Sequence, residues 1–557
     1  MLSKQLFLFL IVFFVFISFI NTNEVQSSKK RQSPAVGTSG IVSSAHPVAT
    51  QVGLDILKSG GNAFDAAVAI AASLNVIEPM NSGIGGYGTI LIYDAIKRKA
   101  RFLDSSGKIP ANVNSDVFRP PTPNYKDNRR GPKAVSTPGN VNAWWAMSSE
   151  YGKLKWDKLF EGAIKTAEQG FEINERFARV INQTFSEFNE YGQAVYGREG
   201  LPLGKGDVLF QRDLAQSFRL IAKEGPGAVY GGKIGKVIDR VMREKGGFLT
   251  IYDLIADRAE WWKPISINYR GYTVATASPP STAFPSLIRL GLMSCFNNVN
   301  LGHNTAGYLH RFAEVTKHAF WCRLAYAGDP GINPPPLDNL LSEKYWKEVV
   351  KNINMKKAMP FSQPKTVVKR GDNTTHFVVA DKWGNIVCAT QTLGNSFGSR
   401  IMVEGTGIWL NNSLAYCTFE PKGNPMDAHA GHRKLSGDCP TIIFKDGKPW
   451  IAIGTPGGHT IGQTVPQMVM NMIDFKMDIQ QAIAAPRISF REPDIILVEG
   501  GINVSVQNAL EDLGHKIRLV EALGNAHGLM IKYDSMGKLV RFFGGADPRG
   551  TGLAKGY

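Results

Sequence analysis

Cysteine is scarce in this sequence, with five residues in a chain of 557. The thiols are widely spaced, and no Cys-x-x-Cys pair or histidine-rich motif occurs. The sequence therefore predicts no disulfide framework and no metal site, and we expect no cofactor. Because five is an odd number, at least one thiol has no partner within the chain. The cysteines are Cys295, Cys322, Cys388, Cys417 and Cys439.

The N-terminus lacks an apolar run of full membrane-spanning length. Its apolar stretch, residues 6–20, is short for a transmembrane helix, which needs about 20 residues. The stretch follows Lys4 and precedes polar residues, which is the pattern of a secretory signal peptide over residues 1–27. An uncleaved signal anchor is the alternative. In both cases we expect the rest of the chain to be extracellular or in the secretory lumen, either free or anchored and facing outward.

A concentrated basic surface is also absent, although 63 basic and 47 acidic residues give a net charge of +16. The basic residues are scattered and no aromatic residues alternate with them, so we expect a solvated surface and no nucleic-acid partner. There is no phosphate-binding loop either. The glycine-rich stretch at residues 82–88 follows a predicted helix and opens a strand, which is the reverse of the order in nucleotide-binding folds.

The composition that remains, 43% apolar and 20% charged, is that of an ordinary globular protein. Helical spacing of apolar residues predicts a helix that opens at His46-Pro47 and ends at Gly60-Gly61. Asn62 is expected to cap a second helix over residues 63–76. The middle third, residues 144–355, is predicted to be mostly helical and to serve packing.

From residue 374 onward the pattern changes to strands. Hairpins are predicted at residues 377–390, 441–453 and 529–543. The second hairpin runs into Pro456-Gly457-Gly458, and a helix follows. Backbone N–H groups of a Gly-Gly turn at a helix start form a natural anion site, although a plain strand-to-helix turn is the alternative.

The junction at residues 371–376, Gly-Asp-Asn-Thr-Thr-His, carries the strongest chemical suggestion. A small, polar segment leads directly into an apolar strand whose first residue is a threonine. A chain that cuts itself before a threonine needs such a segment, because the freed α-amine can then act as the base that a threonine hydroxyl requires. Taken alone, the stretch is more typical of an ordinary loop.

Further short motifs occur in order along the chain from about Ser39 to the C-terminus. They are Gly60-Gly61-Asn62-Ala63-Phe64-Asp65-Ala66-Ala67, Glu78-Pro79, Ser82-Gly83-Ile84-Gly85-Gly86, Thr137-Pro138-Gly139, Thr374-Thr375-His376, Leu410-Asn411-Asn412, Cys439-Pro440-Thr441, Pro456-Gly457-Gly458 and Ala546-Asp547-Pro548-Arg549. On these motifs the chain resembles the γ-glutamyltranspeptidases, also called glutathione hydrolases, a family of N-terminal-nucleophile hydrolases.

The resemblance implies an α+β fold, a four-layer αββα sandwich made as one proenzyme. The chain would cut itself between Asn373 and Thr374. Residues 28–373 would then form a large subunit and residues 374–557 a small one, and the two would stay associated in one folded unit.

The resemblance also implies the catalytic roles. Thr374 would attack the substrate carbonyl with its own α-amine as general base, and Thr392 would orient the Thr374 hydroxyl. The N–H groups of Gly457 and Gly458 would hold the oxyanion. Water, or an amine acceptor such as an amino acid or peptide, would release the acyl group, and His376 would be structural.

The pocket for the acyl group is where the sequence departs from the family. Ser106 stands in place of the arginine that holds the γ-glutamyl α-carboxylate, and a serine cannot replace a bidentate guanidinium. The adjacent serine pair is reduced to Ser436-Gly437. The residues at the positions of the α-amine partners are Gly394, Ser413 and Tyr416. The cations that could supply the lost charge are Arg101, Lys108, Arg433 and Lys434.

Three functions therefore remain open. The first is a self-processing hydrolase of γ-glutamyl amides of the glutathione class. The second is an acylase or amidohydrolase of the same superfamily that accepts a different acyl group. The third is a non-catalytic, secreted binding protein that keeps only the fold. The intact catalytic residues disfavour the third. The altered pocket favours the second, whereas family membership favours the first, and the sequence does not separate these two.

Four Asn-x-Ser/Thr sequons occur in the chain. Those at Asn182 and Asn503 are predicted to be glycosylated in a secreted protein. Those at Asn373 and Asn411 coincide with the expected active site, and we interpret them as chance matches.

Overall fold

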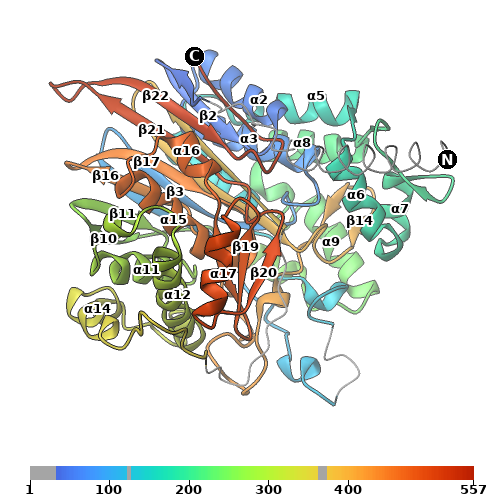
Figure 1. The fold of residues 1–557 in the computed structure, drawn as a ribbon. Helices are drawn as coiled ribbons and strands as arrows, with labels where there is room; N and C mark the ends of the chain where they lie inside the picture. Colours follow the sequence, from blue (N-terminus) through green and yellow to red (C-terminus); the bar gives the residue numbers. More distant parts are fainter. Residues whose placement is uncertain (1–32, 122–126, 362–372) are drawn as a thin grey trace, which may run out of the picture. The chain divides into compact units, whose positions relative to one another are not determined.

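The computed structural model describes residues 33–121, 127–361 and 373–557, drawn in colour in Figure 1. The predicted signal segment, residues 1–27, lies outside these ranges. Within them, no helix is long and apolar enough to span a bilayer. Residues 34–557 belong to one folded unit, which includes residues on both sides of Thr374.

Two seven-stranded sheets form the centre of this unit (Figure 1). Sheet I has the order β23-β2-β12-β13-β3-β4-β9 and sheet II the order β1-β22-β21-β17-β16-β11-β10. The strands of sheet I are β2 (Gly40–Ser44), β3 (Tyr87–Asp94), β4 (Lys99–Ser105), β9 (Glu260–Trp262), β12 (Asn373–Asp381), β13 (Ile386–Gly394) and β23 (Leu553–Gly556). The strands of sheet II are β1 (Ala35–Gly37), β10 (Ile265–Tyr269), β11 (Tyr272–Thr276), β16 (Thr441–Lys445), β17 (Lys448–Gly454), β21 (His527–Tyr533) and β22 (Leu539–Ala546).

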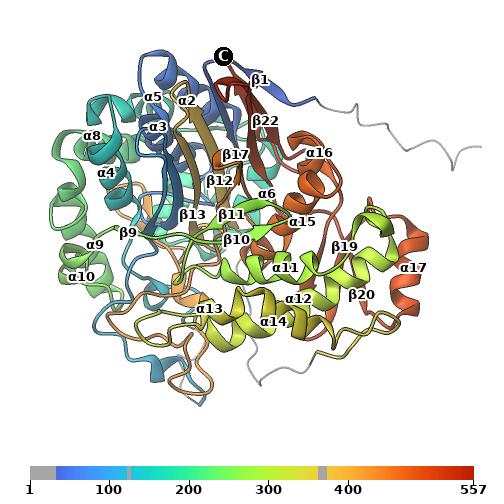
Figure 2. The same ribbon diagram turned by 90° about the vertical axis from the view of Figure 1, so that its left-hand side faces the viewer.

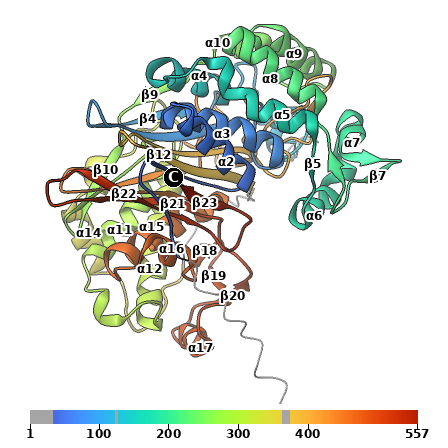
Figure 3. The same ribbon diagram turned by 90° about the horizontal axis from the view of Figure 1, so that it is seen from above.

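Helices cover the outer face of each sheet, as Figures 2 and 3 show. Sheet I is covered by α2 (Pro47–Lys58) and α3 (Ala63–Ile77), with α5 (Glu161–Gln169) and α8 (Arg212–Glu224) packed beyond them. Sheet II is covered by α11 (Phe284–Ser294), α15 (Ile461–Ile473) and α16 (Ile479–Ala484), with α12 (Ala306–Tyr326) packed on α11. The layers therefore run helix, sheet, sheet, helix, which confirms the predicted αββα sandwich.

Smaller elements surround these layers. The other helices are α4 (Asn140–Tyr151), α6 (Glu175–Thr184), α7 (Glu190–Tyr196), α9 (Lys233–Glu244), α10 (Ile251–Ala256), α13 (Leu337–Leu340), α14 (Glu343–Val350) and α17 (Val504–Asp512). The other strands are β5 (Phe171–Glu172), β6 (Gly197–Arg198), β7 (Leu201–Pro202), β8 (Val208–Leu209), β14 (Met402–Val403), β15 (Ile408–Trp409), β18 (Ile488–Arg491), β19 (Ile495–Glu499) and β20 (Ile517–Val520).

The local signals that set the first two helices are visible in the structure. The His46 side chain accepts the N–H of Val48 at the start of α2. At α3 the side chain of Asn62 accepts two helix N–H groups while Asp65 accepts the N–H of Asn62, a complete capping box. Every residue of α3 is buried, which its alanine-rich sequence permits because small side chains let the helix lie close to its neighbours.

The middle third is mostly helical, as predicted, but it also supplies β10 and β11, which form one edge of sheet II. These two strands are only five residues long and partly buried. The spacing of their apolar residues therefore does not distinguish them from the helices on either side. The final strand β23 was likewise not predicted. The five cysteines form no disulfide.

Two histidines lie buried between the sheets. His376 of β12 shares a hydrogen bond with the Thr390 hydroxyl at 2.8 Å. His527 of β21 contacts the Ser43 hydroxyl at 3.2 Å, and Ser43 donates its single proton to Gly545 O. Burial lowers the pKa of His527 to about 4, and burial together with its histidine neighbour holds the pKa of His376 well below the usual 6.5.

This pair predicts acid sensitivity. Both histidines are neutral in the folded protein, whereas the unfolded chain takes up protons below about pH 6.5, so stability is complete above that pH and falls as the pH drops toward 4. Each histidine can contribute up to about 1.4 kcal/mol per pH unit. In unfolding experiments at pH 7, 6 and 5, His527→Gln should show a shallower loss of stability than the unmodified protein. Equal slopes would contradict this assignment.

Candidate active site

Thr374 lies at the start of β12, in the middle of sheet I, and is only 5% exposed. The register with β13 shifts between Asn373 and Thr375, so Thr374 sits at a local irregularity of the ladder. Its hydroxyl donates to the Thr392 hydroxyl at 3.2 Å. Thr392 in turn donates to the carbonyl oxygen of Asn373 at 2.7 Å and accepts the N–H of Gly394 at 2.8 Å. One hydroxyl of β13 thus contacts both sides of the Asn373–Thr374 peptide bond.

The two residues after Thr374 have other partners. Thr375 donates to the buried Glu78 carboxylate at 3.4 Å, and burial raises the pKa of Glu78. The His376 ring is bound to Thr390 and packs against Gly454 at the end of β17, where an added Cβ would come within 2.3 Å of the ring. Neither side chain hydrogen-bonds to the Thr374 hydroxyl in the part of the chain that is described.

The Gly-Gly turn comes three residues after Gly454, the residue of β17 that packs against His376 of β12. Gly457 and Gly458 have φ angles of +131° and +59°, which a residue with a side chain adopts only under strain. A 3₁₀ turn, Gly458–Thr460, begins at the second glycine and leads into α15, and the Thr460 hydroxyl closes it by donating to Gly457 O at 2.9 Å. The turn was predicted, whereas the 3₁₀ segment before the helix was not.

The two serines of the expected acyl pocket already hydrogen-bond to carboxylates. Ser106 follows β4 and donates to Asp104 at 3.1 Å. Ser436 donates to Asp438 at 2.9 Å and lies 3.3 Å from the Thr89 hydroxyl of β3. Gly437 lies beside Gly458, because a Cβ added there would meet Gly458 O at 3.5 Å. Neither Asp104 nor Asp438 was assigned a role from the sequence. The one signal in the sequence is that each lies two positions from a pocket serine.

The four candidate cations differ in how they are used. Arg101 is bound to Glu150 and stacks on the Trp261 ring at 4.2 Å. Arg433 pairs with Asp104 at 2.7 Å and with Glu260 at 2.8 Å. Lys108 is half-buried, and its backbone forms an isolated antiparallel β-bridge with the backbone of Arg433.

Lys434 is the exception among these cations. It is buried, and its ammonium lies 3.3 Å from the centre of the Tyr87 ring and 3.3 Å from Leu435 O. It forms no ion pair with any residue that the structure describes. Burial lowers its pKa to about 8, against the attraction of Asp438, whose own pKa is raised by burial. Tyr87 of β3 is the cross-strand partner of Thr392. Lys434 therefore contacts the residue that is paired with Thr392, and Thr392 contacts Thr374.

The three positions expected to face the α-amine are also buried. Gly394 has a φ of +101°, and an added Cβ would come within 2.2 Å of the Asn412 side-chain oxygen, so no larger residue fits there. The Ser413 hydroxyl donates to the Ser136 hydroxyl. Tyr416 packs in the core on the sheet II side. Gly394 adjoins Thr392, whereas the Ser413 hydroxyl is already engaged.

The glycosylation candidates lie on the surface. Asn182 is exposed on α6, and Asn503 is exposed as the N-cap of α17. Asn411 is fully buried, so its sequon is inaccessible in the folded protein.

A cluster with the composition of a metal site was not anticipated from the sequence. His310, Glu314 and His515 are buried with their ligand atoms within 4.8 Å of one another. The Lys317 ammonium lies 2.9 Å from Glu314, and the two imidazoles share a hydrogen bond of 2.8 Å. A cation of the protein thus already balances the carboxylate. The cluster holds the chain that precedes the expected cleavage site, since Lys317 donates to Met359 O and the His310 ring contacts Asn354 O.

Comparison with known proteins agrees with this arrangement. A sequence profile described as gamma-glutamyltranspeptidase matches residues 49–557. A glutathione hydrolase proenzyme of Escherichia coli is 36% identical over 545 residues, covering 94% of this chain and 93% of that protein. The acylase ACY 1 proenzyme of a Pseudomonas strain is 33% identical over 498 residues, covering 87% and 88%.

Solved structures give the same grouping. A cephalosporin acylase from Bacillus halodurans superimposes with a TM-score of 0.87 at 28% identity, covering 96% of this chain and 98% of that one. The gamma-glutamyltranspeptidase of Helicobacter pylori gives a TM-score of 0.56 at 31% identity, covering 60% and 96%. The chain therefore belongs to the gamma-glutamyltranspeptidase family of self-processing N-terminal-nucleophile hydrolases.

Proposed function

We propose that this protein hydrolyses γ-glutamyl amides of the glutathione class through an acyl-enzyme on Thr374. The observation that carries the proposal is the Thr374–Thr392 hydroxyl pair at the head of β12, with the Asn373 carbonyl on the same Thr392 hydroxyl. The E. coli relative named a glutathione hydrolase proenzyme supports this substrate class.

Self-processing begins at the same atoms. The Thr374 hydroxyl attacks the Asn373 carbonyl carbon, the C–N bond breaks, and the Thr374 nitrogen takes a proton to become an amine, which leaves an ester. Water then hydrolyses that ester and frees the Asn373 carboxylate and the Thr374 hydroxyl. The 2.7 Å bond from Thr392 polarises the carbonyl that is attacked.

Turnover uses the amine that processing frees. An N-terminal amine has a pKa of about 7.7–8.0, so a substantial fraction is neutral near physiological pH and can accept the Thr374 hydroxyl proton. The N–H groups of Gly457 and Gly458 stabilise the tetrahedral oxyanion, and the leaving amine takes the proton. Water, or an amino acid or peptide amine, then attacks the ester and restores Thr374.

For the acyl group, we assign the missing charge to Lys434. Arg101 and Arg433 are already paired with carboxylates. The Lys434 ammonium instead has the Tyr87 ring and Leu435 O as neighbours, and Asp438 attracts it only from beyond ion-pair distance. A substrate α-carboxylate would complete an ion pair there. A lysine offers a single point charge where an arginine offers a planar fork, so we expect weaker selection for the γ-glutamyl group.

A donor assay tests the substrate class. Processed protein should hydrolyse a chromogenic γ-glutamyl anilide weakly, with a high KM, because Ser106 replaces the arginine. A panel of acyl anilides without the α-carboxylate is the comparison. Robust turnover at low KM would contradict the weakened pocket, and turnover of the panel without any γ-glutamyl hydrolysis would overturn the proposed substrate class.

A second candidate is an acylase for a non-glutamyl acyl amide. Two hydroxyls of the pocket favour it. Ser106 and Ser436 donate their protons to Asp104 and Asp438, so neither proton is available to a γ-glutamyl α-carboxylate. The likeness to the cephalosporin acylase of Bacillus halodurans points the same way. The panel above distinguishes the two.

We further propose that the protein acts in the secretory pathway or outside the cell, with glycans at the exposed Asn182 and Asn503. The support is the N-terminal sequence pattern and the exposure of both asparagines. A mass shift of the purified protein on glycosidase treatment tests this assignment.

A further inference from the structure

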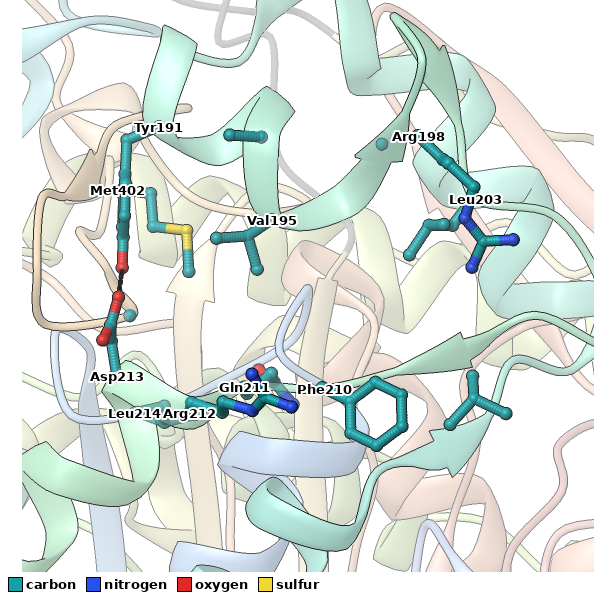
Figure 4. Close-up of a pocket in the computed structure, with 14 residues that line it drawn as sticks. Tyr191, Val195, Arg198, Leu203, Phe210, Gln211, Arg212, Asp213, Leu214 and Met402 are labelled. Carbon is teal, nitrogen blue, oxygen red and sulfur yellow. Dashed lines mark hydrogen bonds between the residues drawn. The ribbon is translucent and has the colours of Figure 1, made fainter.

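A hollow of about 380 Å³ lies where α7, the short strands β6 to β8, the start of α8 and β14 meet (Figure 4). None of its lining residues belongs to the candidate active site. They are Tyr191, Ala194, Val195, Gly197, Arg198, Leu203, Val208, Phe210, Gln211, Arg212, Asp213, Leu214, Met402 and Gly407.

The lining is mostly apolar and partly open to water. Phe210 is 48% exposed and Val208 is 41% exposed, which leaves two large apolar side chains uncovered beside one cavity. In Figure 4, Val195 and Met402 lie across the space from Gln211 and Arg212. The space is large enough for a small organic molecule with one or two rings.

Two arginines give the hollow its charge. The Arg212 guanidinium lies 5.9 Å from the Phe210 ring centre and forms no ion pair with any residue of the described ranges. Arg198 is 3.5 Å from Asp207. The remaining charge of the lining, Asp213, accepts the Tyr191 hydroxyl at 2.5 Å, and Figure 4 shows this pair closing one end. An anion is therefore the complementary ligand at Arg212.

The walls are held in place without a ligand. The side chain of Asn189, the N-cap of α7, bonds both the N–H and the carbonyl of Met402 at 2.9 Å. Gln211 is fixed by its bonds to Val76 O at 2.7 Å and to the Tyr196 hydroxyl at 3.1 Å. Little reorganisation is needed for binding, which favours affinity in a small cavity.

We propose that this hollow binds an amphipathic organic anion, an aromatic carboxylate or sulfonate whose ring covers Val195 and Phe210 while its charge pairs with Arg212. Both halves of the ligand are required. A small inorganic anion gains only an exposed ion pair, and a neutral ring leaves Arg212 without a partner.

The test uses the full chain and the fluorescent probe 8-anilinonaphthalene-1-sulfonate, with naphthalene-1-acetate and its neutral amide as competitors. Arg212→Gln should weaken probe binding about threefold to fivefold, and Val195→Trp, which fills the space, should abolish it. The acid should compete and the amide should not. The matched control is Arg219→Gln, because Arg219 lies on the same helix but is paired with Glu168. It should bind like the unmodified protein.

Three results would overturn the proposal: equal binding by Arg212→Gln, equal competition by acid and amide, or probe binding that survives Val195→Trp. The last result would place the probe elsewhere, including the acyl pocket. Because Thr374 takes no part in the hollow, an unprocessed protein that still binds the probe would separate this site from the proposed function.

Discussion

Thr374→Ala should run as a single full-length band on a denaturing gel and show no measurable turnover. The substitution removes the hydroxyl that we propose attacks the Asn373 carbonyl, so we expect the peptide bond to survive and no N-terminal amine to form. We expect a loss of activity of about 10³-fold or more, as is typical when a covalent nucleophile is removed. The unmodified protein should give two bands, with N-terminal sequencing of the smaller one starting at Thr374.

Two neighbouring threonines serve as controls. Thr375→Val removes a hydroxyl that bonds Glu78 and should still process. Thr392→Val keeps the shape but removes the hydroxyl shared by Thr374, Asn373 and Gly394, so processing should slow without the nucleophile being lost. Cleavage before residue 374 in Thr374→Ala would sink the assignment. An unmodified protein that never splits would favour a non-catalytic role.

Lys434→Met should reduce kcat/KM for γ-glutamyl donors by about 10²-fold, mainly through KM. Removing one partner of a buried charge pair costs about 2–5 kcal/mol, and the substrate carboxylate would be left unpaired. A donor that lacks the α-carboxylate should be affected little, and self-processing should be unchanged. Equal losses for the two donors would show that Lys434 only supports the fold around Tyr87.

The pH dependence gives a second readout for Lys434. Because its pKa is lowered to about 8, the ammonium is charged at pH 7 and largely neutral at pH 9. The preference for the carboxylate-bearing donor over the other donor should therefore decline across that interval, and the ratio cancels the titration of the Thr374 amine. Lys434→Arg keeps its charge at pH 9, so its preference should stay flat. A flat ratio in the unmodified protein would contradict the assignment.

The sequence predicts those features that depend on neighbouring residues. The helix start at His46-Pro47, the cap at Asn62, the helical spacing behind α2 and α3, and the turn between β12 and β13 are local patterns, and the structure has all of them. The family motifs add the layered fold and the place of Thr374, because their order along the chain is specific even though each motif is short.

Features that depend on distant contacts could not be predicted in this way. β10 and β11 join sheet II only through pairing with β16, more than 150 residues later in the chain. The commitment of Ser106 and Ser436 to aspartates is visible only in three dimensions, as is the burial of Lys434 against Tyr87. The tight contact at Gly394 likewise requires the position of Asn412.

The order of strands in sheet I limits the exchange of the two proposed subunits between molecules. β2, which precedes the proposed cleavage site at Asn373–Thr374, pairs on one side with β12 and on the other with β23, both of which follow that site. Two molecules could swap halves only by opening the centre of a sheet, so each cleaved pair should remain with its original partner for the life of the molecule. A mixture of isotopically heavy and light processed protein should therefore yield no hybrids under native conditions.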